Sequence, residues 1–222
     1  PQDRSIRPLP NHSTQSRSLL RRLRGSHSSI PTEKLQYRDC NRILVAVAMA
    51  EAGLFTDDLV SPTVAAALPE GYIVRALRQS DYNTGFLDCL RVLTTVGEIS
   101  EAQFAERYHW LSRSDGYFVL VVEDTSTKTI VGTGALIVER KFIHNLGLVG
   151  HIEDIAVAKD QQGKKLGLRI IQALDFIAAK VGCYKSILDC SEANEGFYVK
   201  CGFRRAGLEM AHYYEGDKSK AQ

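Results

Sequence analysis

The stretch that decides the fold is Gly150-His151-Ile152-Glu153-Asp154-Ile155-Ala156-Val157-Ala158, which continues through Lys159-Asp160-Gln161-Gln162 into Gly163-Lys164-Lys165-Leu166-Gly167. Its first part predicts an apolar strand that carries two acids, and its last part a glycine-bounded turn that opens a long helix. A helix start of this kind presents backbone N–H groups to an anion, because the first N–H groups of a helix lack intrahelical partners. The turn therefore fits a phosphate or pyrophosphate, although an ordinary strand-to-helix turn would have the same pattern. Neither the GxGxxG nor the GxxxxGK[ST] nucleotide spacing is present.

Length and composition indicate one sizeable domain with an appendage. The chain has 222 residues, of which 44% are hydrophobic, and this suffices for one core. No run approaches the roughly 20 apolar residues that a membrane-spanning helix needs, so we expect no membrane span. Residues 1–43 carry nine Arg or Lys and three acids, whereas residues 44–222 carry nineteen and twenty-three. The folded part is thus mildly acidic, which argues against nucleic-acid binding.

The five cysteines predict free thiols. They are odd in number and show no CxxC spacing, so neither a disulfide framework nor a zinc site is indicated. We expect no metal, and we expect thiols that are mostly buried in a reducing compartment. The cysteines are Cys40, Cys89, Cys183, Cys190 and Cys201.

The N-terminal region predicts an extension rather than part of the core. Residues 1–53 are basic, and most of this stretch is poor in acids and rich in Ser and Arg. This composition fits a transit peptide, a disordered tail, an expression remnant or a wrongly joined upstream exon. Because the chain begins at Pro1, Met49 is a candidate natural start. We expect a cytoplasmic protein, and a mitochondrial one only if this segment is a transit peptide.

The remaining chain divides into an adaptor, one domain and a tail. We expect an adaptor at 54–71, where Ser61-Pro62 signals a helix start, a domain at 72–215 and a flexible tail at 216–222. Patterns in the domain predict strands at 72–78, 118–123, 129–139, 150–158, 184–190 and 203–214. Helices are predicted from Ser80 to Leu93, from a capping box at Ser100 to Arg113, after Gly167 to Val181, and at 192–200. The order β-α-α-β-β-β-α-β-α-β indicates an α/β (mixed α+β) domain, a mixed sheet with helices on both faces.

Four motifs together resemble the GNAT acyltransferase superfamily, and within it the eukaryotic, particularly the fungal, glucosamine-6-phosphate N-acetyltransferases. They are Glu153-Asp154-Ile155-Ala156-Val157, Gln162-Gly163-Lys164-Lys165-Leu166-Gly167, the run from Cys183 to Cys190, and the run from Asn194 to Phe203. Leu68–Tyr72, Val92–Gly97 and Lys141–His144 add to the resemblance, which covers about residues 55–214. One departure is Lys165, where the superfamily prefers Gly or Ala.

The resemblance implies a GNAT fold with a mostly antiparallel, twisted central sheet. It implies acetyl-CoA as donor, the 2-amino group of glucosamine 6-phosphate as acceptor, and direct attack in a ternary complex without an acetyl-enzyme. The products would be N-acetylglucosamine 6-phosphate and CoA, within UDP-N-acetylglucosamine biosynthesis. It also implies a homodimer whose site takes residues from both chains.

Cofactor contacts follow from the same resemblance. Backbone N–H groups of Ile155, Ala156 and Val157 would meet the pantetheine, and the N–H of Ile155 would meet the developing oxyanion. Asn194 would bind the cofactor arm. Tyr198 is the general-acid candidate, because a phenol remains protonated at neutral pH and can donate to the departing thiolate; the alternative is core packing beside Phe197. The pyrophosphate would be held by Gly163, Lys164, Lys165, Leu166, Gly167 and Leu168.

Acceptor contacts are expected from acids and from distant basic residues. Glu153 and Asp189 are acids on otherwise apolar strands, where burial of a free charge is costly, so we expect them to bind the amine and help remove its proton; structural ion pairing is the alternative. Asp154 would point to the opposite face if the strand is regular. The sugar phosphate would meet Lys141, His144 and Lys185, with Phe142 and Ile143 in the same loop, a hydroxyl from Thr94, and His212 in place of a basic residue of the last strand. Tyr184, Lys185 and Asp189 would serve the partner's site.

Two other functions remain open from the sequence. The same fold could act on another amine or on a protein lysine. A protein acceptor would require an open acidic groove, whereas Lys141, His144 and Lys185 suit an anionic small molecule. A non-catalytic acyl-CoA-binding module would lack the acid and base groups, and Tyr198, Glu153 and Asp189 are all present.

Overall fold

The computed structural model describes residues 52–212 and Tyr214. The expected tail at 216–222 and all but the last two residues of the expected extension at 1–53, Met49 included, lie outside the described residues. Within them, no helix is long and apolar enough to cross a membrane.

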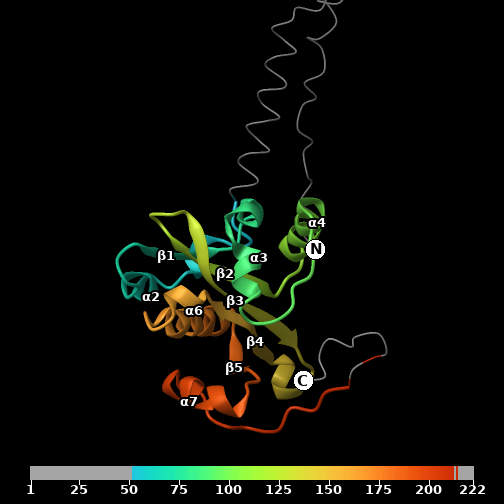
Figure 1. Cartoon of the computed structure of the whole chain (residues 1–222). Helices are drawn as coiled ribbons and strands as arrows, with labels where there is room; N and C mark the ends of the chain where they lie inside the picture. Colours follow the sequence, from blue (N-terminus) through green and yellow to red (C-terminus); the bar gives the residue numbers. More distant parts are fainter. Residues whose placement is uncertain (1–51, 213, 215–222) are drawn as a thin grey trace, which may run out of the picture. The chain divides into compact units, whose positions relative to one another are not determined.

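Five strands form one sheet in chain order. Strand β1 spans Tyr72–Ala76, β2 Tyr117–Asp124, β3 Thr129–Arg140, β4 Leu148–Val157 and β5 Cys183–Ile187. Neighbours in the order β1-β2-β3-β4-β5 pair antiparallel, except that β4 and β5 pair in parallel. Figure 1 shows the sheet with helices on either side. The predicted mixed, mostly antiparallel sheet with helices on both faces is confirmed.

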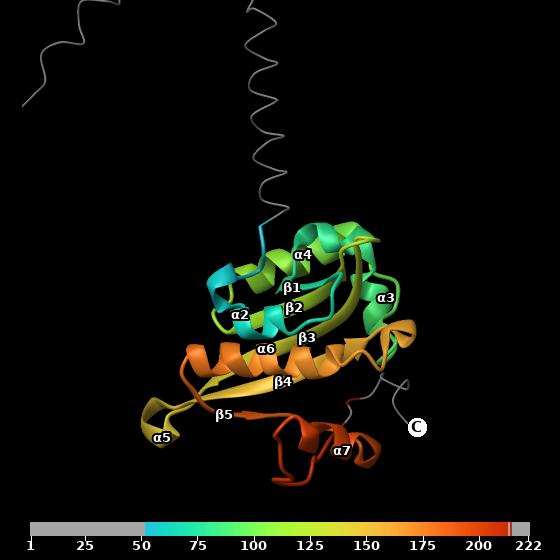
Figure 2. The same cartoon turned by 90° about the vertical axis from the view of Figure 1, so that its left-hand side faces the viewer.

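Helix α6, Leu166–Lys180, covers one face of the sheet (Figure 2). Its apolar side chains recur at three and four residues, so they form one stripe that turns inward. Leu166, Ile170 and Leu174 are at most 1% exposed, and they join Leu136 and Ile152 of the sheet in the main core cluster. Fully burying one such side chain stabilises the fold by about 1.5–3 kcal/mol, so this face anchors the domain. The predicted helix is confirmed, and Gly182 with φ 94° follows its end.

The other face is covered by α3, Phe86–Leu90, and α4, Glu101–Ser112. The predicted capping box of α4 is confirmed, because Ser100 and Gln103 exchange side-chain and backbone bonds. The prediction of a single helix from Ser80 is wrong. A 3₁₀ turn, η2 (Gln79–Thr84), comes first and Gly85 with φ 92° breaks the chain before α3. The second core cluster lies here, with Phe86, Leu87, Phe104, Tyr108, Val121, Ile130 and Leu77.

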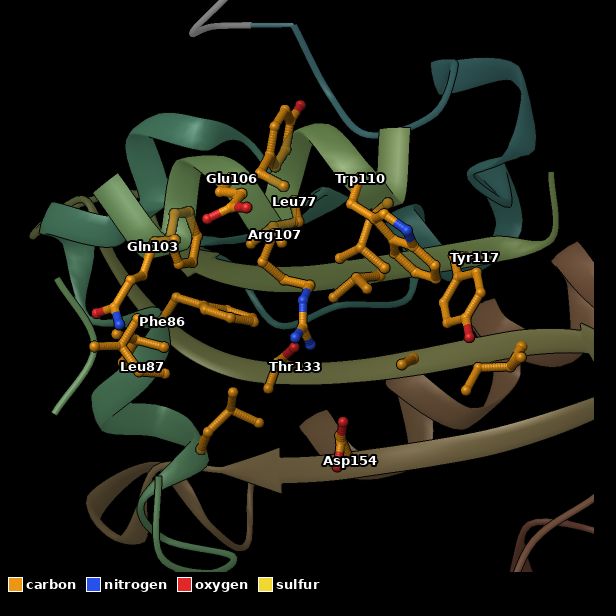
Figure 3. A pocket seen from close by; sticks show the side chains of 18 residues that line it. Leu77, Phe86, Leu87, Gln103, Glu106, Arg107, Trp110, Tyr117, Thr133 and Asp154 are labelled. Carbon is orange, nitrogen blue, oxygen red and sulfur yellow. The ribbon is translucent and has the colours of Figure 1, made fainter. Parts of the chain in front are cut away.

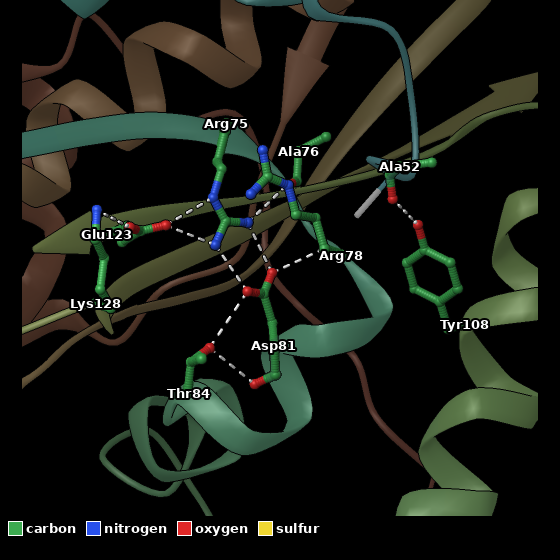
Figure 4. Close-up of polar contacts among 9 residues, drawn as sticks. All are labelled: Ala52, Arg75, Ala76, Arg78, Asp81, Thr84, Tyr108, Glu123 and Lys128. Atoms are coloured by element: carbon green, nitrogen blue, oxygen red, sulfur yellow. Dashed lines mark hydrogen bonds and ion pairs between the residues drawn. The ribbon is translucent and has the colours of Figure 1, made fainter. Parts of the chain in front are cut away.

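A buried ion network fixes β1, β2 and η2 together. The guanidinium of Arg75 donates to both carboxylate oxygens of Asp81 at 2.7 and 2.8 Å, and to Glu123 at 2.8 and 3.0 Å. Asp81 also accepts from the backbone N–H of Arg78 at 2.8 Å, and Lys128 lies 3.6 Å from Glu123 (Figure 4). Because every buried charge here has an opposite partner, the network holds the chain that leads into α3 in one position.

The short elements differ in part from the predictions. The adaptor contains η1 (Asp57–Leu59) and α2 (Pro62–Ala66), and the predicted start at Ser61 is confirmed by its bond from the Val64 N–H at 3.3 Å. The predicted loop before β4 contains a turn, α5 (Ile143–Leu146), in which His144 and Asn145 have positive φ. A 3₁₀ turn, η3 (Lys159–Gln161), follows β4. Strand β5 ends at Ile187, three residues earlier than predicted. Helix α7 spans Glu192–Lys200 as predicted, although Ser191 at its N-cap makes no side-chain capping bond.

The predicted last strand at 203–214 is wrong for the described chain. Residues 203–212 form no strand, and nearly all of them are exposed. A strand needs a neighbour for its backbone hydrogen bonds, and no strand of the described chain pairs with this segment. Its apolar side chains Leu208, Met210 and Tyr214 are at least 83% exposed, so sequence alternation alone did not make it a strand.

Candidate active site

A bulge near the end of β4 shapes the site. Thr133 pairs with Ala156 and Ala135 pairs with Glu153, so Asp154 and Ile155 together oppose the single residue Gly134. Asp154 accommodates the bulge in its backbone conformation, with a φ of 54°. A side chain on Gly134 would not fit, because its Cβ would lie 2.6 Å from Ile155 Cδ1 and 2.7 Å from Ile170 Cγ2. Such a bulge re-aims side chains and frees backbone groups from the regular ladder.

The bulge brings the two acids of β4 to one face, which corrects the expectation for Asp154. Ala135, the partner of Glu153, lines the cavity on the α4 side of the sheet, and Asp154 lines the same cavity. Paired residues of neighbouring strands point to the same face, so Glu153 also points to the α4 side. The expectation of opposite faces assumed a regular strand, and positive φ at Asp154 breaks that regularity.

Beside the bulge, β4 loses its other neighbour. Its parallel pairing with β5 ends at His151 and Ile187, while β4 continues to Val157. From Ile152 onward this edge of β4 has no strand partner among the described residues. Backbone N–H groups of Ile155 to Val157 that face this edge are therefore available to a ligand, as expected for the pantetheine, whereas the carbonyl oxygens of Ala156 and Val157 accept from Cys89 and Gln162.

The turn into α6 has the features of an anion site. Lys165 stands at the N-cap, and within the described chain no side chain caps the helix and its first turn contains no acid. Gly163 has φ 83°, and a Cβ built on it would meet no atom within 4 Å. Nε of Arg169, also in the first turn, is buried without a hydrogen-bond partner. Free helix N–H groups, open space and positive charge together fit the pyrophosphate of a CoA.

The two lysines of this turn differ in their contacts. Lys164 Nζ lies 2.6 Å from Tyr72 Oη and 2.7 Å from Gln161 Oε1, and it lies over the Tyr72 ring. Lys165 has no such contact within the described chain, and its φ of 62° is costly for a residue with a side chain. The sequence departure at Lys165 therefore falls on a strained backbone position, where glycine would be easier to accommodate.

Helix α7 places Tyr198 next to this turn. A Cβ on Gly167 would lie 3.3 Å from the Phe197 ring and 3.8 Å from Val157, so α7 packs against the start of α6. Tyr198 is partly buried against the main core. Burial raises the pKa of its phenol, and the nearby Cys190, Cys201 and Glu153 raise it further. The phenol thus stays protonated at neutral pH, as a general acid must.

The remaining residues expected at this end of β4 are exposed. Asn194 lies in the first turn of α7, where its backbone N–H donates to Ser191 at 2.9 Å. The thiol of Cys89 in α3 lies 3.8 Å from the carbonyl oxygen of Ala156, so α3 ends near the bulge end of β4. Thr94 lies five residues after Cys89, in the loop that follows.

The acids form a group at the same end, and neither of the two expected at the amine is fully buried. Glu153 and Asp189 are both exposed in the described chain, and Asp189 lies beyond the end of β5. Partial desolvation nevertheless raises the pKa of Glu153, and the charges of Asp154, Asp189 and Glu209 raise it further while His151 lowers it. A carboxylate whose pKa is raised toward neutrality is a better proton acceptor.

The basic residues expected at the sugar phosphate lie at the other end of β4. His144 packs on Tyr184 with ring centroids 4.6 Å apart and the ring planes tilted by 39°, and Lys185 lies over the same ring. Lys141 forms an ion pair with Glu139 at 2.7 Å, and Glu139 also contacts His151 at 3.0 Å. Figure 2 shows α5 and the start of α6 at opposite ends of β4.

Within one chain, these basic residues lie apart from the bulge. Six residues separate Leu148 at the start of β4 from Asp154 in the bulge, and at about 3.3 Å per residue this is roughly 20 Å. A hexosamine phosphate is shorter than that. The structure therefore does not bring His144, Tyr184 and Lys185 to the bulge of their own chain, nor Phe142 and Ile143, which are 94% and 63% exposed in the same loop. His212 stacks on Tyr214 in the C-terminal segment.

A cavity of about 910 Å³ lies between α4 and the sheet and contains residues that the sequence reasoning missed. Figure 3 shows Arg107 and Trp110 of α4, Tyr117 of β2 and Thr133 of β3 around the same space as Asp154. The only sequence pattern that could have indicated these residues is the spacing of Gln103, Arg107 and Trp110 along one side of α4. The same pattern is typical of an ordinary solvated helix face. Elsewhere in the described residues, no group of three or more His, Cys, Asp or Glu side chains gathers as for a metal.

The fold and the site define an N-acetyltransferase of the acetyltransferase (GNAT) family, to which the chain belongs. The sequence model of the acetyltransferase (GNAT) family matches residues 75–203. The family assignment agrees with the features of the site. These are the free edge of β4, the bulge, and the uncapped start of α6 beside a protonated phenol.

Relatives place the chain more closely. It is 51% identical over 144 residues to the glucosamine 6-phosphate N-acetyltransferase of Candida albicans, covering 64% of this chain and 96% of that protein. The enzyme of Dictyostelium discoideum is 46% identical, covering 65% and 92%. The crystal structure of the Arabidopsis thaliana enzyme superposes with a TM-score of 0.64 at 36% identity, over 66% of this chain and all of that chain. Within the GNAT family, the chain is a member of the glucosamine 6-phosphate N-acetyltransferases.

Proposed function

We propose that the chain transfers the acetyl group of acetyl-CoA to the 2-amino group of D-glucosamine 6-phosphate, giving N-acetyl-D-glucosamine 6-phosphate and CoA for UDP-N-acetylglucosamine biosynthesis. The observation that carries the proposal is the bulge at Asp154 and Ile155. Two carboxylates lie there, and the edge of β4 beyond its pairing with β5 and the uncapped start of α6 lie at the same end of the strand.

The residues of this chain have separate tasks in the reaction. Acetyl-CoA supplies an activated acetyl thioester, and the first turn of α6 with Lys165 holds its pyrophosphate. The N–H of Ile155 donates to the acetyl carbonyl oxygen as negative charge develops there; one such donor is typically worth about 10²–10³ in rate.

Proton transfers are assigned to Glu153 and Tyr198. Glu153, with its raised pKa, accepts the amine proton directly or through a water, and Asp154 and Asp189 hold the amine nearby. The amine attacks the thioester carbon, and the phenol of Tyr198 donates its proton to the departing thiolate sulfur. No acetyl-enzyme is required, because amine and thioester meet in one ternary complex.

We further propose a homodimer in which each site takes residues from both chains. Three observations support it: β5 is an open edge, the segment at 203–212 has no strand partner in the described chain, and Phe142, Leu208 and Met210 are at least 87% exposed. Large exposed apolar side chains of this kind mark an interaction surface. The partner's His144, Tyr184 and Lys185 would then contact the sugar phosphate bound in this chain's site, because within one chain these residues lie apart from the bulge.

A thiol-release assay with acetyl-CoA and a panel of amines tests the reaction. We expect turnover with glucosamine 6-phosphate to exceed turnover with glucosamine. Equal turnover would reject the amino-sugar phosphate as acceptor, and faster turnover with another amine or a lysine peptide would identify the alternative substrate. Absence of turnover with every amine, while acetyl-CoA still binds, would indicate a non-catalytic acyl-CoA-binding module.

The assembly and location need separate measurements. Light scattering of the purified chain tests the dimer, and a mass of one chain at micromolar concentration would contradict it. We propose a cytoplasmic location, which microscopy of a tagged chain that retains residues 1–53 would check.

A further inference from the structure

The cavity on the α4 side of the sheet has opposite charges on facing walls. Arg107 enters it from α4, and Asp154 enters it from the bulge of β4 (Figure 3). Between them lies the hydroxyl of Thr133 on β3, which donates to the carbonyl oxygen of Leu120 at 3.0 Å. The volume of the cavity is about 910 Å³, which lies in the range of about 300–1,000 Å³ typical of small-molecule sites.

Arg107 has no partner among the described residues. It forms no ion pair or hydrogen bond there, although other exposed arginines do, such as Arg91 with Asp88 and Arg205 with Glu195. The other charged residue of α4 on this wall is Glu106. Arginine is well suited to phosphate, because its planar fork of N–H groups donates two parallel hydrogen bonds.

Asp154 is likewise without a hydrogen bond or ion pair to a cation in the described chain, and it does not pair with Arg107. Arg107 and Asp154 therefore face each other across this space without pairing, and Glu106 also lines the α4 wall. A ligand with both an ammonium and a phosphate at its two ends matches this pattern, whereas a neutral or singly charged ligand leaves one wall unmatched.

We propose that Arg107 binds the phosphate of the acceptor and thereby helps to select phosphorylated over unphosphorylated amino sugars. This inference rests on the proposed function. The amine lies at Glu153 and Asp154, and the sugar ring lies over Thr133 and Ala135 with its phosphate toward α4. Arg107 thus supplies a phosphate contact from the same chain as the bulge, whereas Lys141 and His144 precede the start of β4, roughly 20 Å from Asp154, and Lys185 pairs with Val149 near that start.

The test compares Arg107→Met with Arg107→Lys and with a matched control. Arg113→Met removes an exposed arginine from the end of the same helix, outside the cavity. Steady-state kinetics with glucosamine 6-phosphate and with glucosamine are measured for each variant, together with the melting temperature and the mass in solution.

For Arg107→Met we expect kcat/KM with glucosamine 6-phosphate to fall about 10- to 100-fold, mainly through KM, since a hydrogen bond to a charged group typically contributes this much. The same ratio with glucosamine should change less than about threefold, and KM for acetyl-CoA should stay the same. Arg107→Lys should retain an intermediate preference because it keeps the charge and loses the fork. Arg113→Met should match the wild type.

The outcomes separate this inference from the proposed function. A wild type without any preference for the phosphorylated sugar overturns the proposed function itself. A wild type with that preference and an Arg107→Met variant with the same preference overturns only the role of Arg107. Equal losses with both sugars, or a loss that follows dissociation of the dimer, assigns Arg107 to folding or to contact with a second copy and also overturns the inference.

Discussion

Glu153 and Asp154 are consecutive in β4, yet both side chains lie on the α4 face of the sheet, because Asp154 adopts φ 54° within the bulge. The charge of Asp154 is the largest electrostatic influence on Glu153, after desolvation, and it raises the pKa of that carboxyl. The two acids thus act on each other, which has a measurable consequence for the pH dependence of the reaction.

Asp154→Asn should move the acidic limb of kcat/KM to lower pH. A general base works above its pKa, and removing a neighbouring negative charge lowers the pKa of Glu153. Asp189→Asn should shift the limb in the same direction but less, because Asp189 has the smaller influence. pH–rate profiles of the three proteins check this, with Asp57→Asn in the exposed turn η1 as the control. An unmoved limb in Asp154→Asn would exclude Glu153 as the titrating base.

Tyr198→Phe should lower kcat by about ten- to a thousand-fold and change KM less, since general-acid help is typically worth 10²–10⁴. Because burial raises the pKa of the phenol, the loss of activity that follows deprotonation of Tyr198 should occur at a pH above the ordinary phenol value of about 10. Tyr82→Phe is the control, because Tyr82 only donates to the carbonyl oxygen of Ile99 at 3.0 Å. If kcat of Tyr198→Phe equals that of the wild type, Tyr198 has only a packing role.

Gly134→Ala should destabilise the fold by about 1–3 kcal/mol, the usual cost of an overpacked core. The new methyl group would lie 2.6 Å from Ile155 and 2.7 Å from Ile170, so Ile155 must move and kcat should fall as well. Gly196→Ala is the matched control within α7, where a Cβ meets nothing within 4 Å; it should be neutral or stabilising by up to about 1 kcal/mol. Urea unfolding measures both. Wild-type stability and rate in Gly134→Ala would mean that the bulge tolerates a side chain.

Lys165→Gly and Lys165→Ala separate strain from charge. Both remove the positive charge, so both should raise KM for acetyl-CoA by a few-fold if Lys165 lies beside the pyrophosphate. Only glycine relieves the φ of 62°, so Lys165→Gly should be more stable than Lys165→Ala by about 1 kcal/mol. Thermal unfolding without ligand measures the difference. Equal stability would show that the left-handed conformation costs nothing here, and an unchanged KM would place the charge away from the cofactor.

Asp81→Asn should destabilise the protein by about 3–5 kcal/mol, because it leaves Arg75 buried with one fewer charged partner. Arg75 is 9% exposed and Asp81 1% exposed, so water cannot replace the lost interaction. Asp88→Asn breaks the surface pair with Arg91 and should cost less than about 1 kcal/mol. Denaturant midpoints of both variants check the contrast, and similar midpoints would show that the buried network contributes no more than a surface pair.

The regular elements could be predicted because their signals are local. The stripe at Leu166, Ile170 and Leu174 repeats with the helical period, and the box at Ser100 and Gln103 is a contact between neighbours in sequence. Either signal is complete within a few residues. Neither depends on where the rest of the chain lies, so the sequence sufficed.

The outline of the site could also be predicted, because its motifs are contiguous. Glu153 to Val157, the turn at Gly163 to Gly167, and the helix that carries Tyr198 lie at one end of β4, as the resemblance implied. The roles of those residues stay predictions until the variants above are measured.

Other features depend on contacts between distant segments. The faces of Glu153 and Asp154 depend on a single residue, Gly134, of the neighbouring strand. His144 lies roughly 20 Å from the bulge, because the β3–β4 connection is at the opposite end of the sheet, and Lys185 pairs with Val149 near that end. Arg107 entered the site only through the packing of α4 over β2 and β3. The sequence by itself determined the family and most of the helices and strands, since these rest on local periodicity and contiguous motifs; the helix from Ser80 and the last strand are the exceptions. Tertiary structure decided which charges face one another, since that depends on strand register and helix packing.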